Sequence, residues 1–504
     1  FFHPDWAVPI CVAILGTLLV RIVDISLGFL AYKLYVETIR LPFPLQGVDA
    51  SLVETVVGRP ADRMRVLIIS AVIGIGWGLL AYGAPLASAG AIQLLPLPFA
   101  SLNRFMERIF PGSSFGISID LMAHCVGLLL PFWTSISIFL GSLSFYTIGN
   151  GILVSLYPEK PAGIFGWTPG MDIMQCYQWS NLYIWSSVTI GLGLAAGLVP
   201  LLKNIKVLLR AFSRTPIGRS EVKVLSPVPI WIPIATWAAA SIISVVLTAM
   251  LVPGFPVWIL VLLSFGWTPI SVLIVGRMLG ETSLAPTGGV GGGSLFYVRE
   301  AAFIGSGYQH IDIWYAPLVV SYGGGHGILA QFKVCELTGT KLMSIVKGLF
   351  FAYPIAWLMS FLLVQLFWLI APIPSAAYPM AMATWPFSVT MSNIMVSGFR
   401  SFFRPELATT ALVIGVGLQL AIDFFHLPFS LIGFLVGAVT MVPFGLAYLI
   451  GGIAGKIMAW RIGNEKWNDY KVVIVAGIIL GGSIVASTAA AIGLISKAKW
   501  VLPY

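Results

Sequence analysis

Carboxylates that could carry protons occur in a chain dominated by apolar residues. Glu281 lies in a glycine-rich stretch, residues 276–341, while Asp120 and Asp24 lie in earlier apolar segments, Asp24 three residues after Arg21. A carboxyl group at membrane depth can bind a proton from one side and release it at the other. Glu281 is therefore the preferred candidate for proton coupling, and Asp120 and Asp24 are further candidates.

These acids also have structural interpretations. Arg277 precedes Glu281 by one helical turn, so an ion pair that simply neutralises both groups is an equal alternative. Asp120 precedes His124 by four residues, which permits a proton relay or a contact that only fixes a helix end. For Asp120 the structural interpretation is preferred.

Backbone groups in the glycine-rich stretch could hold the anionic end of a substrate. Thr287, Gly288 and Gly289 precede one expected half-helix, and Tyr322 and His326 belong to a second glycine cluster. The N-terminus of a helix offers free N–H groups and partial positive charge, and glycine permits close approach. These residues are predicted to bind substrate, although tight helix packing also enriches glycine.

Lys333 completes the predicted substrate-binding set, with a position at the membrane interface as its alternative role. His310 and His326 are sixteen residues apart, a spacing without the regularity of metal ligands, so no metal site is predicted. The four cysteines form no CxxC pair. No nucleophile motif, HExxH or phosphate-binding loop is evident, so neither an enzyme nor a cofactor is expected.

The elements that must position these residues are membrane helices. Of 504 residues, 58% are hydrophobic and 9% charged, whereas soluble globular proteins have about 25% charged residues. Apolar runs of about 20 residues favour an all-α polytopic membrane protein over a barrel, whose strands alternate over roughly ten residues. We expect about 12–14 membrane elements in a multi-pass protein of the cell membrane.

The formal net charge of +9 has a topological explanation. Lys and Arg accumulate in the cytoplasmic loops of membrane proteins, so the charge indicates no nucleic-acid partner. The expected partners are a small-molecule or peptide substrate, protons and the lipid bilayer. Assembly into a homo-oligomer is left open.

One basic segment divides the chain. Residues 202–227 contain six basic side chains and are predicted to be a cytoplasmic linker. Residues 1–201 would then hold the remainder of a first transmembrane repeat, with a hairpin near 115–156. Residues 228–504 would hold the second repeat, with a hairpin near 291–330 that contains broken helices.

More detailed boundaries follow from proline, glycine and apolar runs. A hinge is expected near Pro131, and a long span is expected from Leu342 to Ile370. Two half-helices are expected at 293–305 and 311–330, and one uninterrupted span at 428–453.

An internal similarity supports two repeats. The segment HCVGLLLPFWTSISIFLGSL (124–143) and the segment FLVGAVTMVPFGLAYLIGGI (434–453) each have a VG pair, a PF pair and a second glycine fourteen residues after the first. Chance similarity between apolar segments is an equal alternative. About five elements precede the linker and about nine follow, so we expect roughly three or four N-terminal elements to be absent from this chain.

Three strings resemble one family. RLPFPLQGVDA (40–50) resembles the KLPFPSGTA-type segment of the oligopeptide transporter family, which includes yellow-stripe-like metal-chelate transporters. GETSLAPTGGVGG (280–292) resembles its GxTxxNPTGxxG segment, and QFKVCELTGTK (331–341) its DFKTGxLLG element. The resemblance implies two inverted repeats whose hairpins meet at a central substrate site, and proton-coupled uptake.

The chain departs from the family pattern at three places. Ala285 replaces an asparagine, Leu45-Gln46-Gly47 replaces residues rich in hydroxyls, and Val334-Cys335 replaces Thr-Gly. The predicted function is a secondary transporter for proton-coupled uptake of short peptides or metal-chelate-like small molecules by alternating access. A transport-inactive structural or accessory membrane subunit is the alternative, and a channel is less favoured because no ring of like polar residues is evident.

Overall fold

A computed structural model describes most of the chain between residues 4 and 501. Outside the described residues lie 1–3, 59, 88–93, 97, 157–164, 204–227, 285–296, 309, 311, 320–323, 502–504 and, between 376 and 403, all but 378, 381, 385 and 389. The predicted cytoplasmic linker is thus almost wholly outside the described part, and so is the Thr-Gly run of the glycine-rich stretch.

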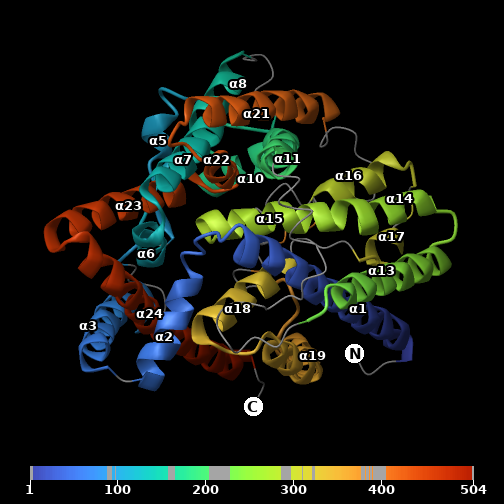
Figure 1. Cartoon of the computed structure of the whole chain (residues 1–504), viewed down its shortest axis with the longest axis horizontal. Coiled ribbons are helices and arrows are strands. Elements are labelled where there is room, and N and C mark those ends of the chain that lie inside the picture. Colours follow the sequence, from blue (N-terminus) through green and yellow to red (C-terminus); the bar gives the residue numbers. More distant parts are fainter. Residues whose placement is uncertain are drawn as a thin grey trace.

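Helices dominate the described structure, as the apolar runs predict (Figure 1). Before the linker they are α1 (Ala7–Tyr32), α2 (Gln46–Gly58), α3 (Ala61–Gly78), α4 (Ala84–Ala87), α5 (Asn103–Met106), α6 (Leu121–Leu129), α7 (Phe132–Leu143), α8 (Asn150–Leu156), α10 (Ile173–Ser180) and α11 (Ser186–Lys203). After it they are α13 (Trp231–Leu251), α14 (Val257–Val261), α15 (Thr268–Thr282), α16 (Tyr297–Gly305), α17 (Asp312–Tyr315), α18 (Gly324–Thr338), α19 (Leu342–Ile370), α21 (Pro405–Phe425), α22 (Leu431–Ala438), α23 (Val442–Ile462) and α24 (Asn464–Val501). A small antiparallel pair consists of β1 (Phe99–Ser101) and β2 (Gly116–Ser118).

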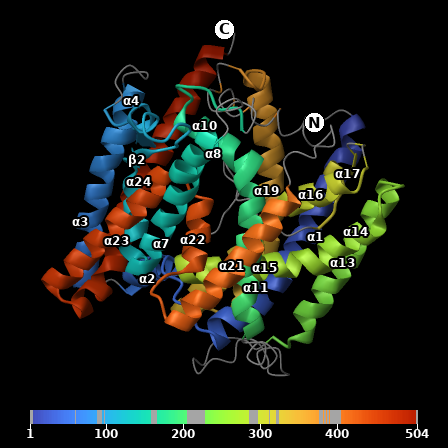
Figure 2. The same cartoon turned by 90° about the horizontal axis from the view of Figure 1, so that it is seen from above.

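Ten helical segments among the described residues are long and apolar enough to cross a membrane. Several of them join α-helices through a π-helical turn; α1, for example, continues into the turn Lys33–Thr38. Helix α3 packs along α24, and α1 packs along α13 (Figure 2). The prediction of an all-α polytopic membrane protein is confirmed.

Two helices are interrupted in a similar way. The break between α6 and α7 lies at the expected hinge, since Pro131 disfavours helix in the residue before it. The expected uninterrupted span 428–453 is wrong: residues 439–441 separate α22 from α23, and α23 continues to Ile462. Pro443 lies in the first turn of α23, where its missing N–H is not needed, so it favours a new helix start there.

The interrupted helices cross one another through glycine. Helix α6 packs on α23 and α7 packs on α22. Gly127 and Gly451 lie so close to the opposite helix that a Cβ on either would overlap a backbone carbonyl oxygen, and Gly141 and Gly437 form a second pair of the same kind. We call these four helices the crossed-helix cluster.

A second group of helices surrounds α1. Helix α1 packs against α13 and α18 and also contacts α15. Figure 1 shows α1, α18 and α19 on the side of α15 away from α7 and α22. The buried side chains of this group form one continuous apolar core that includes Leu27, Tyr35, Val272 and Leu329.

Helix α15 extends into the glycine-rich stretch. It runs to Thr282 and is followed by Ser283, whose φ of 53° is left-handed. Arg277 and Glu281 therefore lie inside a helix that belongs to a candidate span, rather than in the broken part of the glycine-rich stretch.

One of the two expected half-helices differs from the structure, whereas α16, at 297–305, agrees with the described part of the other. The segment expected as one half-helix at 311–330 is divided: α17 has only four residues, and α18 begins at Gly324 and continues to Thr338. Pro317 lies two residues after the end of α17 and disfavours its continuation. As a result His326 lies in the first turn of α18, and Lys333 lies in its interior.

Candidate functional site

Residues 39–45 form a strap without regular secondary structure between the π-helical turn that continues α1 and the start of α2. Pro42 and Pro44 have no N–H groups and disfavour helix in the residues before them. Phe43, between the two prolines, has a φ of 45° and a fully buried side chain. The N–H groups of Ile39 and Leu41 bond back to the carbonyl oxygens of Leu34 and Tyr35. Those of Phe43 and Leu45 need partners from elsewhere, because buried backbone donors are nearly always hydrogen-bonded.

The end of α15 supplies those partners. The Phe43 N–H donates to the carbonyl oxygen of Gly280 at 2.9 Å, and the Leu45 N–H donates to Ser283 Oγ at 2.9 Å. Ser283 Oγ in turn donates to Gln46 Oε1 at 3.1 Å. Two strings separated by more than 200 positions in the sequence are thus bonded directly to each other.

The third string reaches the same place through Lys333. Its Nζ lies 5.9 Å from the centre of the Phe43 ring and 2.7 Å from Glu336 Oε2. The side chains of Lys333 and Glu336 are only 15% and 22% exposed, so the ion pair is largely removed from solvent. The structure therefore brings together residues from all three family-like strings.

A second ion pair lies at the end of α1. Lys33 Nζ is 2.8 Å from Glu37 Oε2, and these side chains are 9% and 12% exposed. The Tyr32 hydroxyl is buried and has no hydrogen-bond partner among the residues that the structure describes. Both Glu37 and Glu336 interact electrostatically with that hydroxyl, so the two ion pairs share one neighbourhood.

Sequence reasoning missed Glu37 and Glu336 as site residues. Each follows a lysine at helical spacing, Lys33 by four residues and Lys333 by three, which is a recognisable signal for an ion pair. The sequence does not show that α1 and α18 pack against each other. This packing buries both ion pairs, which on isolated helices would face solvent.

Glu281 forms an ion pair with Arg277, which was the structural alternative to a role in proton coupling. Arg277 Nε donates to Glu281 Oε1 at 2.7 Å, and Arg277 Nη1 donates to the carbonyl oxygen of Ala196 at 3.2 Å. Ser430, the N-cap of α22, donates from Oγ to Glu281 Oε2 at 3.3 Å. Glu281 thus links α15 to the N-cap residue of α22, one of the four helices of the crossed-helix cluster.

The other two acids have structural contacts of their own. Asp24 is buried in α1, and Arg21 Nη1 lies 3.5 Å from its Oδ2. Asp120 is the N-cap of α6 and accepts a hydrogen bond from the Met122 N–H at 2.9 Å. His124 Nδ1 contacts the backbone carbonyl oxygen of Asp120, at 2.9 Å, and this contact does not involve the carboxylate.

Among the remaining predicted substrate-binding residues, only His326 lies in the described part. Thr287, Gly288, Gly289 and Tyr322 lie outside the described residues. The Nδ1 atom of His326 is buried and has no hydrogen-bond partner in the part of the chain that is described. Burial lowers the pKa of His326 to about 4, so its imidazole is neutral near pH 7.

No group of three or more His, Cys, Asp or Glu side chains comes together in the described ranges. The four cysteines are free thiols, and Cys125, Cys176 and Cys335 are buried. The described site contains ion pairs, a hydroxyl and backbone N–H groups.

The fold and these contacts define a polytopic helical membrane protein with buried charge between its helices. A family model for the OPT oligopeptide transporter protein matches residues 2–491. The chain belongs to this family of membrane transporters. A comparison with curated proteins found no match.

Proposed function

We propose that this protein is a proton-coupled secondary transporter that takes up short peptides or metal-chelate-like small molecules by alternating access. The observation that carries the proposal is the meeting of the strap, the end of α15 and Lys333 beside two buried ion pairs. Buried charge between membrane helices is costly unless it is paired, and it is typical of substrate and ion pathways.

Lys333 is proposed to bind the anionic group of the substrate. Its ammonium group already holds one carboxylate, that of Glu336, at 2.7 Å. A substrate carboxylate that reaches Lys333 would compete with Glu336 for the same donor. Glu336, once displaced, is left in a poorly solvated place, where it favours binding a proton.

Glu281 is proposed to couple proton binding to helix movement. Its carboxylate holds Arg277 on one side and the N-cap hydroxyl of α22 on the other. Protonation removes the charge that attracts Arg277 and weakens the acceptor for Ser430 Oγ. The contact between α15 and α22 then depends on proton occupancy, which is what alternating access by a coupled carrier requires. Asp120 and Asp24 are the fallback candidates for this role.

The pairing of four glycines supports a further part of the proposal, that the chain contains two inverted repeats. Gly127 and Gly437 are equivalent in the two similar segments, as are Gly141 and Gly451. In space, the first glycine of each segment pairs with the second glycine of the other. Two related units packed around a two-fold axis make this reciprocal contact.

Uptake into proteoliposomes tests the function. The purified full chain is reconstituted and offered a panel of labelled peptides and metal chelates, with and without an inward proton gradient. We expect at least one compound to accumulate only with the gradient. Folded protein that moves none of them would favour a structural or accessory subunit, and gradient-independent flux of ions would favour a channel.

Replacement of Glu281 by Gln tests the coupling step in the same vesicles. We expect E281Q to retain exchange of internal for external substrate and to lose gradient-driven accumulation, because glutamine can hold the Ser430 contact but cannot release a proton. The conservative variant E54Q, at a half-exposed carboxylate 3.8 Å from Arg63, is the control. Undiminished accumulation by E281Q would move the coupling site to Asp120 or Asp24.

A further inference from the structure

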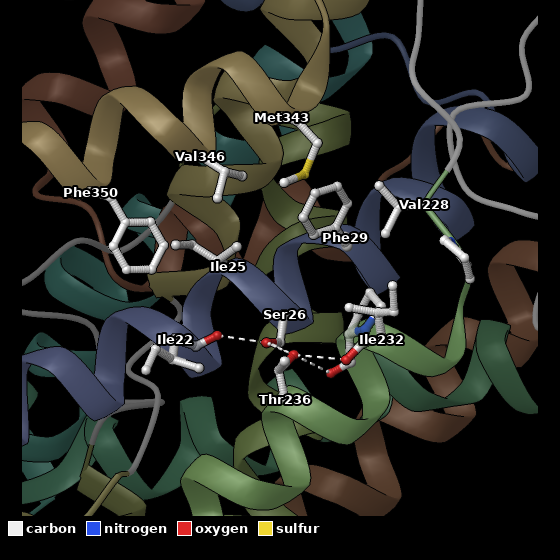
Figure 3. A pocket seen from close by; sticks show the side chains of 12 residues that line it. Ile22, Ile25, Ser26, Phe29, Val228, Ile232, Thr236, Met343, Val346 and Phe350 are labelled. Atoms are coloured by element: carbon white, nitrogen blue, oxygen red, sulfur yellow. Dashed lines mark hydrogen bonds between the residues drawn. The ribbon is translucent and has the colours of Figure 1, made fainter.

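An apolar crevice of about 350 Å³ lies between α1, α13 and α19. Figure 3 shows Ile25 and Phe29 of α1 facing Met343, Val346 and Phe350 of α19 across this space. Val228, Ile232 and Pro233 close it from the α13 side. Its volume falls within the range of roughly 300–1,000 Å³ that is typical of ligand sites.

The two hydroxyl groups in the crevice are already satisfied. Ser26 Oγ donates to the carbonyl oxygen of Ile22 at 2.7 Å and lies 2.8 Å from Thr236 Oγ1. Thr236 Oγ1 also bonds to the carbonyl oxygen of Ile232 at 2.9 Å. A ligand therefore meets carbon almost everywhere, which excludes a peptide or a chelate, whose polar groups would be left without partners.

The crevice lies near the N-terminal ends of α13 and α19, which places it towards one surface of the membrane. On α19 its furthest lining residue, Phe350, is about 12 Å along the helix from Leu342. Trp231, at the start of α13, is strongly exposed, as is typical of aromatic anchors at the membrane interface.

The outer surface around the crevice is apolar and faces outward. Along the most apolar part of α19 none of the residues is buried within the protein, and Phe351 and Ile355 are well over half exposed. In a membrane, a crevice that opens on such a surface is in contact with lipid chains rather than with water.

Positive charge borders the opening. Lys347 lies one helical turn from both Met343 and Phe350 on the same side of α19, and Lys341 is the N-cap of the helix. Both lysine side chains are exposed. Two ammonium groups beside an apolar crevice at interfacial depth fit the phosphate of a lipid whose chain fills the crevice.

We propose that this crevice binds one acyl chain of an anionic phospholipid of the bilayer, whose phosphate pairs with Lys347 and Lys341. The site is separate from the proposed transport site, because it lies on the outward side of α1 and has no free polar group. A bound lipid would contact α1, α13 and α19 together, and would therefore stabilise their arrangement.

Photolabelling tests the proposal. The full chain is placed in phosphatidylcholine nanodiscs that contain a small fraction of phosphatidylglycerol with a diazirine on one acyl chain, and labelled peptides are mapped by mass spectrometry. We expect label on α1 at residues 22–29 and on α19 at 343–350, and about tenfold less label there when the probe has a phosphatidylcholine headgroup.

Variants separate the acyl and headgroup contacts. Val346→Trp fills the crevice and should lower labelling at α1 about tenfold with either headgroup. Ile25→Trp does the same from α1, in case the first variant does not fold. Lys347→Gln should reduce phosphatidylglycerol labelling to the phosphatidylcholine level, and Leu358→Trp, on the exposed part of α19, should change nothing.

Three outcomes would overturn the proposal. Label spread evenly along α19 would mean general lipid contact without a site. Unchanged labelling of α1 in both tryptophan variants would mean that the chain does not enter the crevice. Equal labelling by both headgroups in the unmodified protein would remove the role of the lysines and of anionic lipid.

Discussion

The crossed-helix cluster and the region around the strap hold helices together by opposite means. In the crossed-helix cluster, α6 meets α23 and α7 meets α22 because glycine places no side chain between them. Around the strap, the end of α15 is hydrogen-bonded to residues 43 and 45, and the Lys333 ammonium group of α18 lies over the Phe43 ring; one ion pair lies within α18 and another within the π-helical turn that follows α1. Direct packing of two backbones offers no polar group for which a substrate could compete. In the strap region, by contrast, a substrate or a proton can compete for the polar contacts.

This difference suits one region to stay rigid and the other to change its contacts. Close-packed backbone resists any added atom, so the crossed-helix cluster is suited to keep its geometry while other helices move. Paired charges and donated N–H groups hold only as long as nothing competes for them, so the strap region is suited to change. Glu281, which bonds to Arg277 within α15 and to Ser430 at the start of α22, joins the two regions.

The largest effect is expected from Gly437→Ala in the crossed-helix cluster. The added Cβ would overlap the carbonyl oxygen of Ile138, so the helices must separate, at a cost of about 3 kcal/mol. Gly417→Ala in α21, where no atom lies within 4 Å of a new Cβ, is the matched control and should be neutral or stabilising. Loss of monodisperse protein on heating in detergent measures both. Equal stability of the two variants would contradict the proposed rigidity.

Glu336→Gln should affect transport more than stability. Lys333 then loses its counter-ion in a largely buried place, and the substrate no longer releases a carboxylate on binding. We expect gradient-driven uptake to fall about tenfold, corresponding to about 1.4 kcal/mol, while the heating midpoint moves less than in Gly437→Ala. Uptake by E336Q at the level of the E54Q control would show that this ion pair has no part in transport.

Ser283→Ala probes the attachment of the strap. The Leu45 N–H loses its acceptor, and Gln46 Oε1 loses a donor, which should cost about 1–2 kcal/mol. Ser344→Ala, at an exposed position on α19, is the control. We expect S283A to bind substrate more weakly, seen as a raised KM, with a modest fall in thermal stability. A KM identical to that of the control would separate the strap from the substrate site.

The smallest effect is expected from His326→Gln, and only below neutral pH. The folded protein holds the pKa of His326 at about 4, while the unfolded chain has the ordinary value of about 6.5. Below about pH 6.5 the unfolded state therefore binds a proton that the folded state does not, and stability falls as the pH is lowered towards 4. H326Q should lose less thermal stability than the unmodified protein between pH 7 and pH 5. Parallel curves would show that the imidazole is not shielded from solvent.

Local chain signals predicted much of the fold. The long span from Leu342 to Ile370 and the hinge at Pro131 agree with the structure, because length, apolarity and proline act on the chain locally. The break at 439–441 was not predicted. It interrupts an apolar run that has no proline at the break itself, and the crossing with α7 that accompanies it depends on a partner far away in the sequence.

The sequence segments that form the candidate site could be predicted, whereas the contacts between them could not. The strings that contain Phe43, Gly280 and Lys333 can be found by similarity, but their direct contact depends on how α1, α15 and α18 pack. The same packing buried Glu37 and Glu336, whose spacing to lysine looks like that of a solvated helix face. Sequence spacing gives the neighbours along one helix, whereas burial is decided by other helices.

The balance of charge in the strap region bears on how membrane voltage would act on the protein. Two lysines face two glutamates, and Arg277 faces Glu281, so these groups together carry no net charge when all are ionised. Moving one net elementary charge across a membrane potential of 100 mV changes its free energy by about 2.3 kcal/mol. Moving a neutral set of charges as a unit changes its free energy by nothing of this kind. In the proposed transport cycle, movement of these groups without substrate would then be insensitive to voltage, and the potential would act on the step in which substrate and proton are carried together.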